Sequence, residues 1–218
     1  MSGRRQLMIA DAALPYTRVD YLQNVKDVVQ YIDTGIEFDP AENLCIAATV
    51  ADISSGRSIV CSSFYGVYND CFGLEFGGTS NSAAYKPRIY TIAGPRNQAA
   101  SVFGDAVADG VATGITASYN NSASTVTLAY SGKTFTASVP RGSSTDPGYG
   151  PLRVFCDYRT NNSAMLNPIR LYALSIARGG TPVRNFIPVL DGNGVPCLYD
   201  KISGTFFRNG GNGTLLYG

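Results

Sequence analysis

Histidine and tryptophan are both absent from this sequence of 218 residues. The absence of histidine excludes Ser-His-Asp triads, Cys-His dyads and metal sites with imidazole ligands. The absence of tryptophan removes the side chain best suited to stacking on sugar faces and on cations. Any functional site in this chain must therefore be built from other residue types.

Charged residues are also scarce. They make up 15% of the sequence, against roughly 25% in an average soluble domain. The 17 Lys and Arg residues nearly balance the 16 Asp and Glu residues, giving a formal net charge of +1. A nucleic-acid-binding protein needs a concentrated basic surface to displace counterions from phosphates, so this balance argues against that class. Aromatic residues at 11% and the lack of a long charged tract argue against disorder.

Long apolar runs are missing. No stretch reaches the roughly 18 apolar residues that a transmembrane helix requires. Arg4 and Arg5 lie near the N-terminus, but no apolar run of signal-peptide length follows them. We therefore expect a protein that is made in a cytoplasm, has no signal peptide and does not insert into a membrane.

Cysteine usage indicates neither disulfides nor a metal site. The five cysteines are Cys45, Cys61, Cys71, Cys156 and Cys197. Their odd number and the lack of a C-x-x-C spacing argue against a disulfide framework and against zinc. We expect reduced thiols that act as small apolar side chains, and no cofactor.

The residues that are abundant favour short strands joined by turns. The sequence has 24 Gly, 11 Pro, 14 Tyr and 10 Phe residues, a mixture typical of β-proteins. Strand-length blocks separated by Gly, Ser and Asn clusters are residues 16–22, 44–50, 57–65, 71–76, 88–93 and 115–119. Residues 21–30 alone have a pattern that permits a short helix, and no solenoid repeat is visible.

The strongest local signal is a β-hairpin over residues 124–139. Two alternating segments flank Ser131 and Gly132, which form a plausible two-residue turn. The predicted pairs across the turn are Tyr130 with Lys133, Leu128 with Phe135, and Val126 with Ala137. The other face carries Thr127, Ala129, Thr134 and Thr136. Because strand side chains alternate, one face is expected to pack on a core and the other to face solvent.

The C-terminal third continues the strand pattern. Strict alternation over residues 169–176 places Ile169, Leu171, Ala173 and Ser175 on one face, and Tyr172, Leu174 and Ile176 on the other. Turns at residues 178–182, 191–194 and 203–204 separate the strands that follow. The whole pattern predicts an all-β fold, a two-sheet antiparallel jelly-roll sandwich over residues 16–218 with a short N-terminal arm of residues 1–15.

Two stretches carry a resemblance to a known family. The first comprises residues 21–23 (YLQ) and 30–36 (QYIDTGI). The second comprises residues 170–174 (RLYAL), 183–191 (VRNFIPVLD), 194–201 (GVPCLYDK), 203–204 (SG), Phe206 and 209–210 (NG). On these motifs, residues 16–218 resemble the concanavalin A-like, laminin-G-like jelly-roll modules of bacteriophage and prophage structural proteins and of gut-bacterial surface proteins, with the middle of the chain matching only in strand pattern.

The resemblance implies a sandwich whose concave face or edge loops bind glycans or other proteins. In phage relatives, such modules belong to head fibres, decoration proteins, tail fibres or baseplates. We therefore expect a non-enzymatic structural or accessory protein of a phage virion (head fibre, decoration or tail-associated module), assembled in the host cytoplasm. Its expected partners are other virion proteins, further copies of itself in a homo-oligomer, and cell-surface glycans. A stand-alone bacterial carbohydrate-binding module is the first alternative.

A glycoside hydrolase is the second alternative. Residues 37–42 (EFDPAE) spell E-x-D-x-x-E, the catalytic pattern of laminarinase-type hydrolases of the same fold, in which two carboxylates flank the scissile bond. Glu37 and Glu42 would take those roles here. Pro40 removes a ladder donor and favours a turn, so Glu42 is expected to leave the strand face. We therefore predict no catalytic residues.

Other acidic residues indicate turns more than metal sites. Asp105 and Asp109, and the loop of residues 191–194, offer oxygen atoms, but they lack the dense ligand pattern of a calcium loop. Asp33 and Asp200 are expected to accept hydrogen bonds from backbone N–H groups in turns.

Two groups of residues remain as candidate interaction sites. The predicted assembly arm contributes Arg4, Arg5, Leu7, Ile9 and Leu14, which would contact a neighbouring subunit. The candidate ligand or interface aromatics are Tyr65, Tyr68, Tyr85, Tyr149 and Tyr158, which lie in loop-rich regions.

Overall fold

The computed structural model describes residues 14–53, 57–63, 71–77, 86–93, 98–139, 151–156 and 167–218. In these ranges the regular elements are all β-strands, so no helix there could cross a membrane. The short helix permitted over residues 21–30 is wrong, because this segment contains only β2 (Leu22–Gln23) followed by turns.

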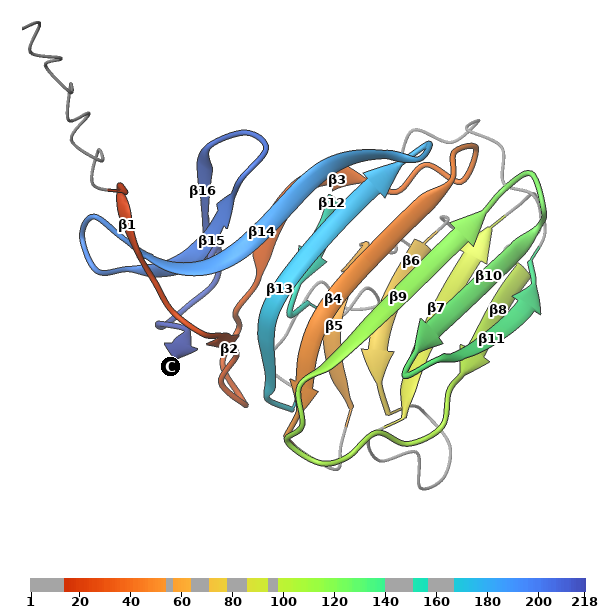
Figure 1. Cartoon of the computed structure of the whole chain (residues 1–218), viewed down its shortest axis with the longest axis horizontal. Coiled ribbons are helices and arrows are strands. Elements are labelled where there is room, and N and C mark those ends of the chain that lie inside the picture. Colours follow the sequence, from red (N-terminus) through yellow and green to blue (C-terminus); the bar gives the residue numbers. More distant parts are fainter. Residues whose placement is uncertain are drawn as a thin grey trace, which may run out of the picture.

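Two antiparallel sheets lie face to face (Figure 1). The larger sheet has eight strands in the order β11 (Lys133–Ser138), β10 (Thr125–Tyr130), β9 (Thr113–Asn120), β4 (Leu44–Asp52), β13 (Ile169–Arg178), β14 (Thr181–Asp191), β15 (Pro196–Asp200) and β16 (Thr205–Arg208). It is completed by β1 (Tyr16–Arg18) on β14, and by β2 between β13 and β17 (Leu216–Tyr217). The smaller sheet has the order β3 (Ile32–Glu37), β12 (Pro151–Val154), β5 (Ser58–Ser63), β6 (Cys71–Phe76), β7 (Pro87–Ala93) and β8 (Gln98–Phe103). The predicted all-β jelly-roll sandwich is confirmed.

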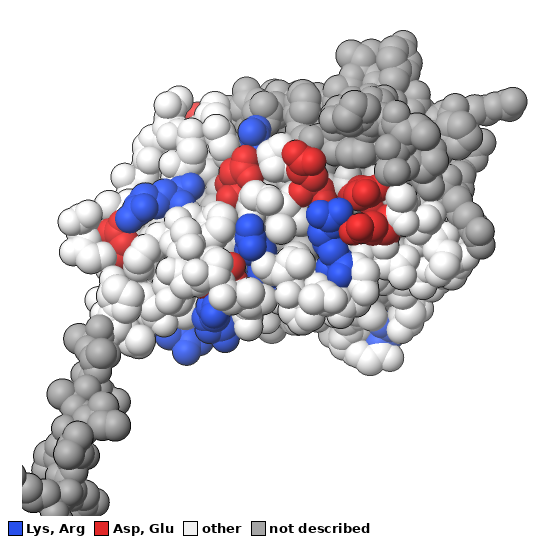
Figure 2. Space-filling model, turned by 90° about the horizontal axis from the view of Figure 1, so that it is seen from above, with Lys and Arg blue, Asp and Glu red and all other residues white. Residues whose placement is uncertain are grey.

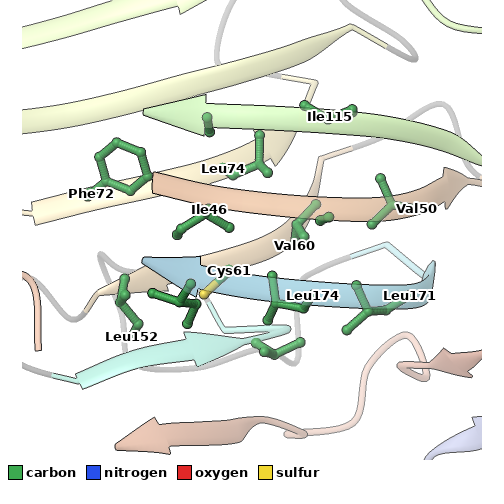
Figure 3. Close-up of a cluster of buried hydrophobic side chains, with 14 of the residues drawn as sticks. Ile46, Val50, Val60, Cys61, Phe72, Leu74, Ile115, Leu152, Leu171 and Leu174 are labelled. Carbon is green, nitrogen blue, oxygen red and sulfur yellow. The ribbon is translucent and has the colours of Figure 1, made fainter. Parts of the chain in front are cut away.

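The core fills the space between the sheets. Inward side chains from β4, β9 and β13 meet those from β5, β6 and β12, as Figure 3 shows. Ile46 and Val50 of the larger sheet are fully buried, as are Val60 and Leu74 of the smaller one. Burial of this apolar surface, at roughly 25 cal/mol per Å², is the main force that holds the sheets together.

The predicted hairpin forms with the predicted register. Tyr130 pairs with Lys133, Leu128 with Phe135, and Val126 with Ala137. β9 adds to the hairpin as a third antiparallel strand, so the three strands form a meander. Ser131 and Gly132 both have positive φ angles, which suits a tight two-residue turn.

The alternation predicted for residues 169–176 is wrong beyond Leu171. A β-bulge places Leu171 opposite Val50 and Ala173 opposite Thr49, so that Tyr172 is an extra residue in the strand. Leu171 and Leu174 are therefore both buried in the core, although strict alternation puts them on opposite faces. An inserted residue reverses the face of every residue after it.

β13 changes its pairing partner beside this bulge. Arg170 and Leu171 pair with β2, whereas Leu174 and the residues after it pair with β14. β14 separates from the sandwich there and pairs with β15 on one edge and β1 on the other. These strands form the extension at the left of Figure 1. Ile187, Val189 and Cys197 form its own small core, which Tyr16, Tyr199 and Phe206 cover.

Two carboxylates fix the turns of this extension. Asp200 is fully buried and accepts hydrogen bonds from the backbone N–H groups of Asn185, Ile202 and Ser203 and from the Ser203 hydroxyl. Burial raises the pKa of Asp200, but these hydrogen bonds outweigh it and the net effect lowers the pKa. Asp33 accepts a hydrogen bond from the Gly35 N–H, but both residues lie within β3 of the smaller sheet. The predicted turn role is confirmed for Asp200, whereas Asp33 binds a backbone N–H inside a strand and not in a turn.

Asp191 plays the same part at the preceding turn. It accepts hydrogen bonds from the N–H groups of Asn193 and Val195, and from the guanidinium of Arg208 at 2.6 Å. The Val195 hydrogen bond, followed by that of Arg208, lowers the pKa of the Asp191 carboxyl. The oxygen atoms of the 191–194 loop are thus engaged in holding the turn.

Candidate binding face

The outer face of the larger sheet carries small uncharged side chains over β11, β10, β9, β4 and residues 173–177 of β13. Residues that face the core alternate along each strand with residues that face outward. The outward-facing residues are Cys45, Ala47 and Thr49 on β4; Gly114, Thr116 and Ser118 on β9; and Ala173, Ser175 and Ala177 on β13. The same face continues over β10 and β11 through Thr125, Thr127, Ala129, Thr134, Thr136 and Ser138. A solvent-facing sheet commonly carries Lys and Glu side chains, and their absence from these positions gives a flat surface that a ligand can approach closely.

Two shallow depressions lie end to end along β4 on this face. One, of about 250 Å³, is lined by backbone and small side chains that include Ala47, Thr116, Ser175 and Asn185. The other, of about 180 Å³, includes Cys45, Ser118 and Asn120 in its lining. Both are open to solvent and lie between β9 and β13. Together they form a groove along the middle strand of the face.

Two tyrosines lie at the end of this face where the sheet forks. Tyr172, at the bulge, is half-buried and contacts Tyr21, with ring centroids 5.6 Å apart. The Arg170 guanidinium lies 4.7 Å from the centroid of the Tyr21 ring, and its Nε donates a hydrogen bond to Gln23 Oε1. The adjacent residue, Ala173, lines the larger depression. The fork therefore adds an aromatic pair and one cation to the rim of an uncharged groove.

Charges elsewhere on the described surface are mixed. Figure 2 shows Lys and Arg side chains lying beside Asp and Glu side chains on the face that it displays. Among the described residues, Arg178 forms an ion pair with Glu42, and Lys133 forms one with Asp105.

The thiols have the properties of apolar side chains. None of the five cysteines, all of which lie in the described residues, is in a disulfide bond. Burial raises the pKa of the Cys45 thiol at the groove, and burial followed by the Asp191 charge raises the pKa of Cys197 to about 11. Both are thiols and not thiolates at neutral pH, so neither is activated as a nucleophile.

The acidic motif of residues 37–42 runs from the end of β3 into the turn before β4. β3 ends at Glu37, and the Asp39 carboxylate accepts a hydrogen bond from the Ala41 N–H in a turn. Glu42 forms an ion pair of 2.8 Å with Arg178 of β13. Glu42 therefore leaves the strand that carries Glu37, as Pro40 predicted.

Of the two acidic loop residues considered for calcium, one forms an ion pair with a lysine and the other is exposed in a turn. Asp105 binds Lys133 at 2.7 Å, and this contact lowers the pKa of the Asp105 carboxyl. Asp109 lies in a turn at Gly110 and is exposed. In the ranges that the structure describes, no cluster of three or more Cys, Asp or Glu residues is arranged to hold a metal ion.

Most of the site residues predicted from sequence lie outside the described residues. This holds for Arg4, Arg5, Leu7 and Ile9 of the arm and for Tyr65, Tyr68, Tyr85, Tyr149 and Tyr158. Leu14 is described and is 67% exposed, directly before β1. The groove and the Tyr21–Tyr172 pair were not predicted. Alternating Ala, Ser and Thr residues in β4 and β9 were the available signal for the groove, but the bulge that turns Tyr172 outward has no local sequence signature.

Comparisons with known proteins place the chain by fold alone. No family model and no curated protein matches it. Domains LG4-5 of the mouse laminin α1 chain align with 77% of this chain and 42% of that chain, at 14% identity and a TM-score of 0.45. The CBM40 module of the Ruminococcus gnavus IT-sialidase aligns with 72% of this chain and 89% of its own, at 13% identity and a TM-score of 0.47.

A third similar structure is the enzymatically active domain of tailspike protein 2 from bacteriophage CBA120. It aligns over 63% of this chain and 22% of that one, at 16% identity and a TM-score of 0.43. The chain thus spans less than half of the laminin and tailspike chains. The described strands of this chain themselves define a two-sheet antiparallel β-sandwich.

Proposed function

We propose that this protein is a non-enzymatic binding module that recognises glycans on the outer face of its larger sheet and serves as a structural or accessory subunit of a phage virion. The observation that carries the glycan part is the uncharged groove along β4, whose rim is formed by hydroxyl, amide and aromatic groups. Such groups match the hydroxyls and apolar ring faces of a sugar without the desolvation of buried charge.

The size of the face favours a small ligand over a protein. Strands lie about 4.8 Å apart and rise about 3.3 Å per residue, so the outer face of β11, β10, β9, β4 and β13 measures roughly 25 Å across the strands and about 20 to 33 Å along them, or about 600 Å². A stable protein–protein interface takes roughly 800 Å² from each partner. An oligosaccharide lying along the groove needs much less.

The virion role is supported by the segment before β1. Tyr16 packs on Tyr199 and Phe206, so the chain is anchored to the C-terminal extension at the first strand. Leu14 is exposed there. Arg4, Leu7 and Ile9 precede this anchor in the sequence, and their apolar and basic side chains are of the kind that would contact a neighbouring subunit.

The first prediction concerns activity. We expect no hydrolysis of β-glucans or of other polysaccharides, because Glu37 ends a strand while Glu42 is paired with Arg178 on the other sheet. The measurement is release of reducing ends from a polysaccharide panel. Turnover that disappears in Glu37→Gln would show that the protein is an enzyme.

The second prediction concerns assembly. Deleting residues 2–14 should leave the melting temperature unchanged, because the exposed Leu14 contributes nothing to the core, and should abolish oligomer formation or incorporation into particles. Light scattering measures the mass, and sedimentation with particles measures incorporation. A truncated protein that assembles normally, or that fails to fold, would contradict the arm's role, and normal assembly together with glycan binding would favour a stand-alone carbohydrate-binding module.

A further inference from the structure

We propose that Tyr172, supported by Tyr21, is the sugar-stacking platform of the groove, and that the ligand is a neutral oligosaccharide that extends from this platform along β4. The inference rests on the glycan-binding function proposed above. It adds the position of the aromatic contact and the class of sugar.

The bulge in β13 is what brings Tyr172 to the outer face. Because of the inserted residue, the core residues Leu171 and Leu174 are separated by two successive residues that do not enter the core, Tyr172 and Ala173. Ala173 lines the larger depression, so the preceding tyrosine lies at its end. Bulges commonly occur next to binding sites, where they redirect a side chain. Here the redirected side chain is aromatic, on a face whose other strand positions are small.

Contacts on the far side hold the platform in place. The Tyr21 ring contacts Tyr172 at an interplanar angle of 57°, and Arg170 lies over the Tyr21 ring. The Tyr21 backbone N–H donates to the Gly218 carbonyl oxygen, and a Cβ added at Gly218 would come within 2.7 Å of the Tyr21 ring. Tyr21 is thus packed from several directions and gives Tyr172 a fixed support. A tyrosine that is held in place before binding loses little conformational entropy when a ligand stacks on it.

Hydrogen-bonding groups line the groove next to the platform. Two backbone hydrogen bonds hold Asn185 in place. Its N–H donates to the Asp200 carboxylate, and its carbonyl oxygen accepts from the Lys201 N–H. Its side chain, with those of Thr49, Thr116 and Ser175, contributes to the lining of the depression. These groups both donate and accept hydrogen bonds, as sugar hydroxyls do.

The charges around the platform favour a neutral ligand. No charged side chain of the described residues lines either depression. Arg170, the cation at the rim, already lies over Tyr21 and donates to Gln23. Asp20, next to Tyr21, is exposed and has a charge of opposite sign. Arg170 and Asp20 have opposite charges, so together they offer no net positive charge that would favour a carboxylate on the sugar.

The test compares two site variants with a distant aromatic control. Tyr172→Ala removes the platform. Gly114→Tyr fills the depression, because a Cβ at Gly114 meets nothing within 4 Å and a ring there extends over the groove. Phe103→Ala removes a 43% exposed ring on β8 of the smaller sheet. Isothermal titration uses tri- to hexasaccharides of glucose, galactose, mannose and N-acetylglucosamine, and uronic-acid oligosaccharides as the charged arm, on variants whose circular dichroism matches the wild type.

We expect the wild type and Phe103→Ala to bind the same neutral oligosaccharide, and both site variants to lose about tenfold or more in affinity, the equivalent of roughly 1.4 kcal/mol. If the wild type binds no sugar of either arm, the proposed glycan function itself is wrong. If it binds and both site variants bind equally well, only the position of the subsite is wrong. Binding restricted to the uronic acids and lost in Arg170→Gln would overturn the neutral class.

Discussion

Replacing Phe186 with alanine is expected to lower the free energy of unfolding by about 3–5 kcal/mol, the range for removal of a buried phenylalanine. Phe186 is fully buried at the point where β14 leaves the sandwich, and its ring packs edge-on against Phe207 with centroids 5.0 Å apart. The cavity would lie between the main core and the C-terminal extension. Phe186 pairs with Leu174 on one side and with Asp200 on the other. Neither neighbouring strand can therefore move in to fill the cavity without breaking its backbone hydrogen bonds to β14.

Urea denaturation of the two proteins measures this loss, with Tyr217→Ala as the control. Tyr217 is 48% exposed on the short strand β17, and its removal should cost less than about 1 kcal/mol. A loss for Phe186→Ala as small as that of the control would mean that the β14 register is not the one described.

Replacing Glu75 with glutamine is expected to have a comparable effect, a loss of about 3–5 kcal/mol, because the change removes a buried negative charge that two guanidinium groups contact. Glu75 is 1% exposed on β6 and lies between two guanidinium groups. Arg57 contacts one carboxylate oxygen at 2.6 Å, and Arg88 contacts the other at 2.9 Å. Arg88 is itself enclosed, with its Nη2 bound to Ser101 and its guanidinium 4.8 Å from the Phe103 ring centroid. One carboxylate therefore forms ion pairs with two guanidinium groups that have little access to water.

The exposed pair of Lys133 and Asp105 is the matched control. Their separation of 2.7 Å is as short, but the two side chains are 57% and 60% exposed. Asp105→Asn should cost much less stability than Glu75→Gln, and that cost should fall in high salt, which screens exposed charges and affects buried ones little. Equal losses for Glu75→Gln and Asp105→Asn in denaturant titrations would show that burial does not govern the strength of the Glu75 cluster.

Local sequence rules were sufficient wherever the structure depends on neighbours in the chain. The hairpin at Ser131 and Gly132 forms with its predicted pairs because a two-residue turn sets the register of both strands. Asp33 and Asp200 bind backbone N–H groups within a few residues, which a short carboxylate side chain does from its own position. Glu42 does not continue the strand that carries Glu37, and this too was predicted locally, because Pro40 favours a turn between them.

The bulge at Tyr172 shows where these rules end. The alternation rule assumes that each residue of a strand lies opposite one residue of its partner. Whether a residue is inserted depends on the pairing with the partner strands and not on the sequence of β13 alone. Thr49 and Val50, more than a hundred residues earlier in the chain, fix the insertion. A purely local interpretation therefore placed Leu174 on the wrong face and could not see that Tyr172 joins Tyr21 at the groove.

The sequence by itself determined the all-β class, the strand-and-turn order, the lack of histidine chemistry and the near-neutral charge. Each of these depends on composition or on residues close together in the chain. The tertiary structure alone decided which face of the larger sheet packs on the core, where the sheet forks, and that Arg57, Glu75 and Arg88 share one buried cluster. These features arise when strands distant in sequence pair and pack, because the partner strand sets the register, and register decides which side chains meet.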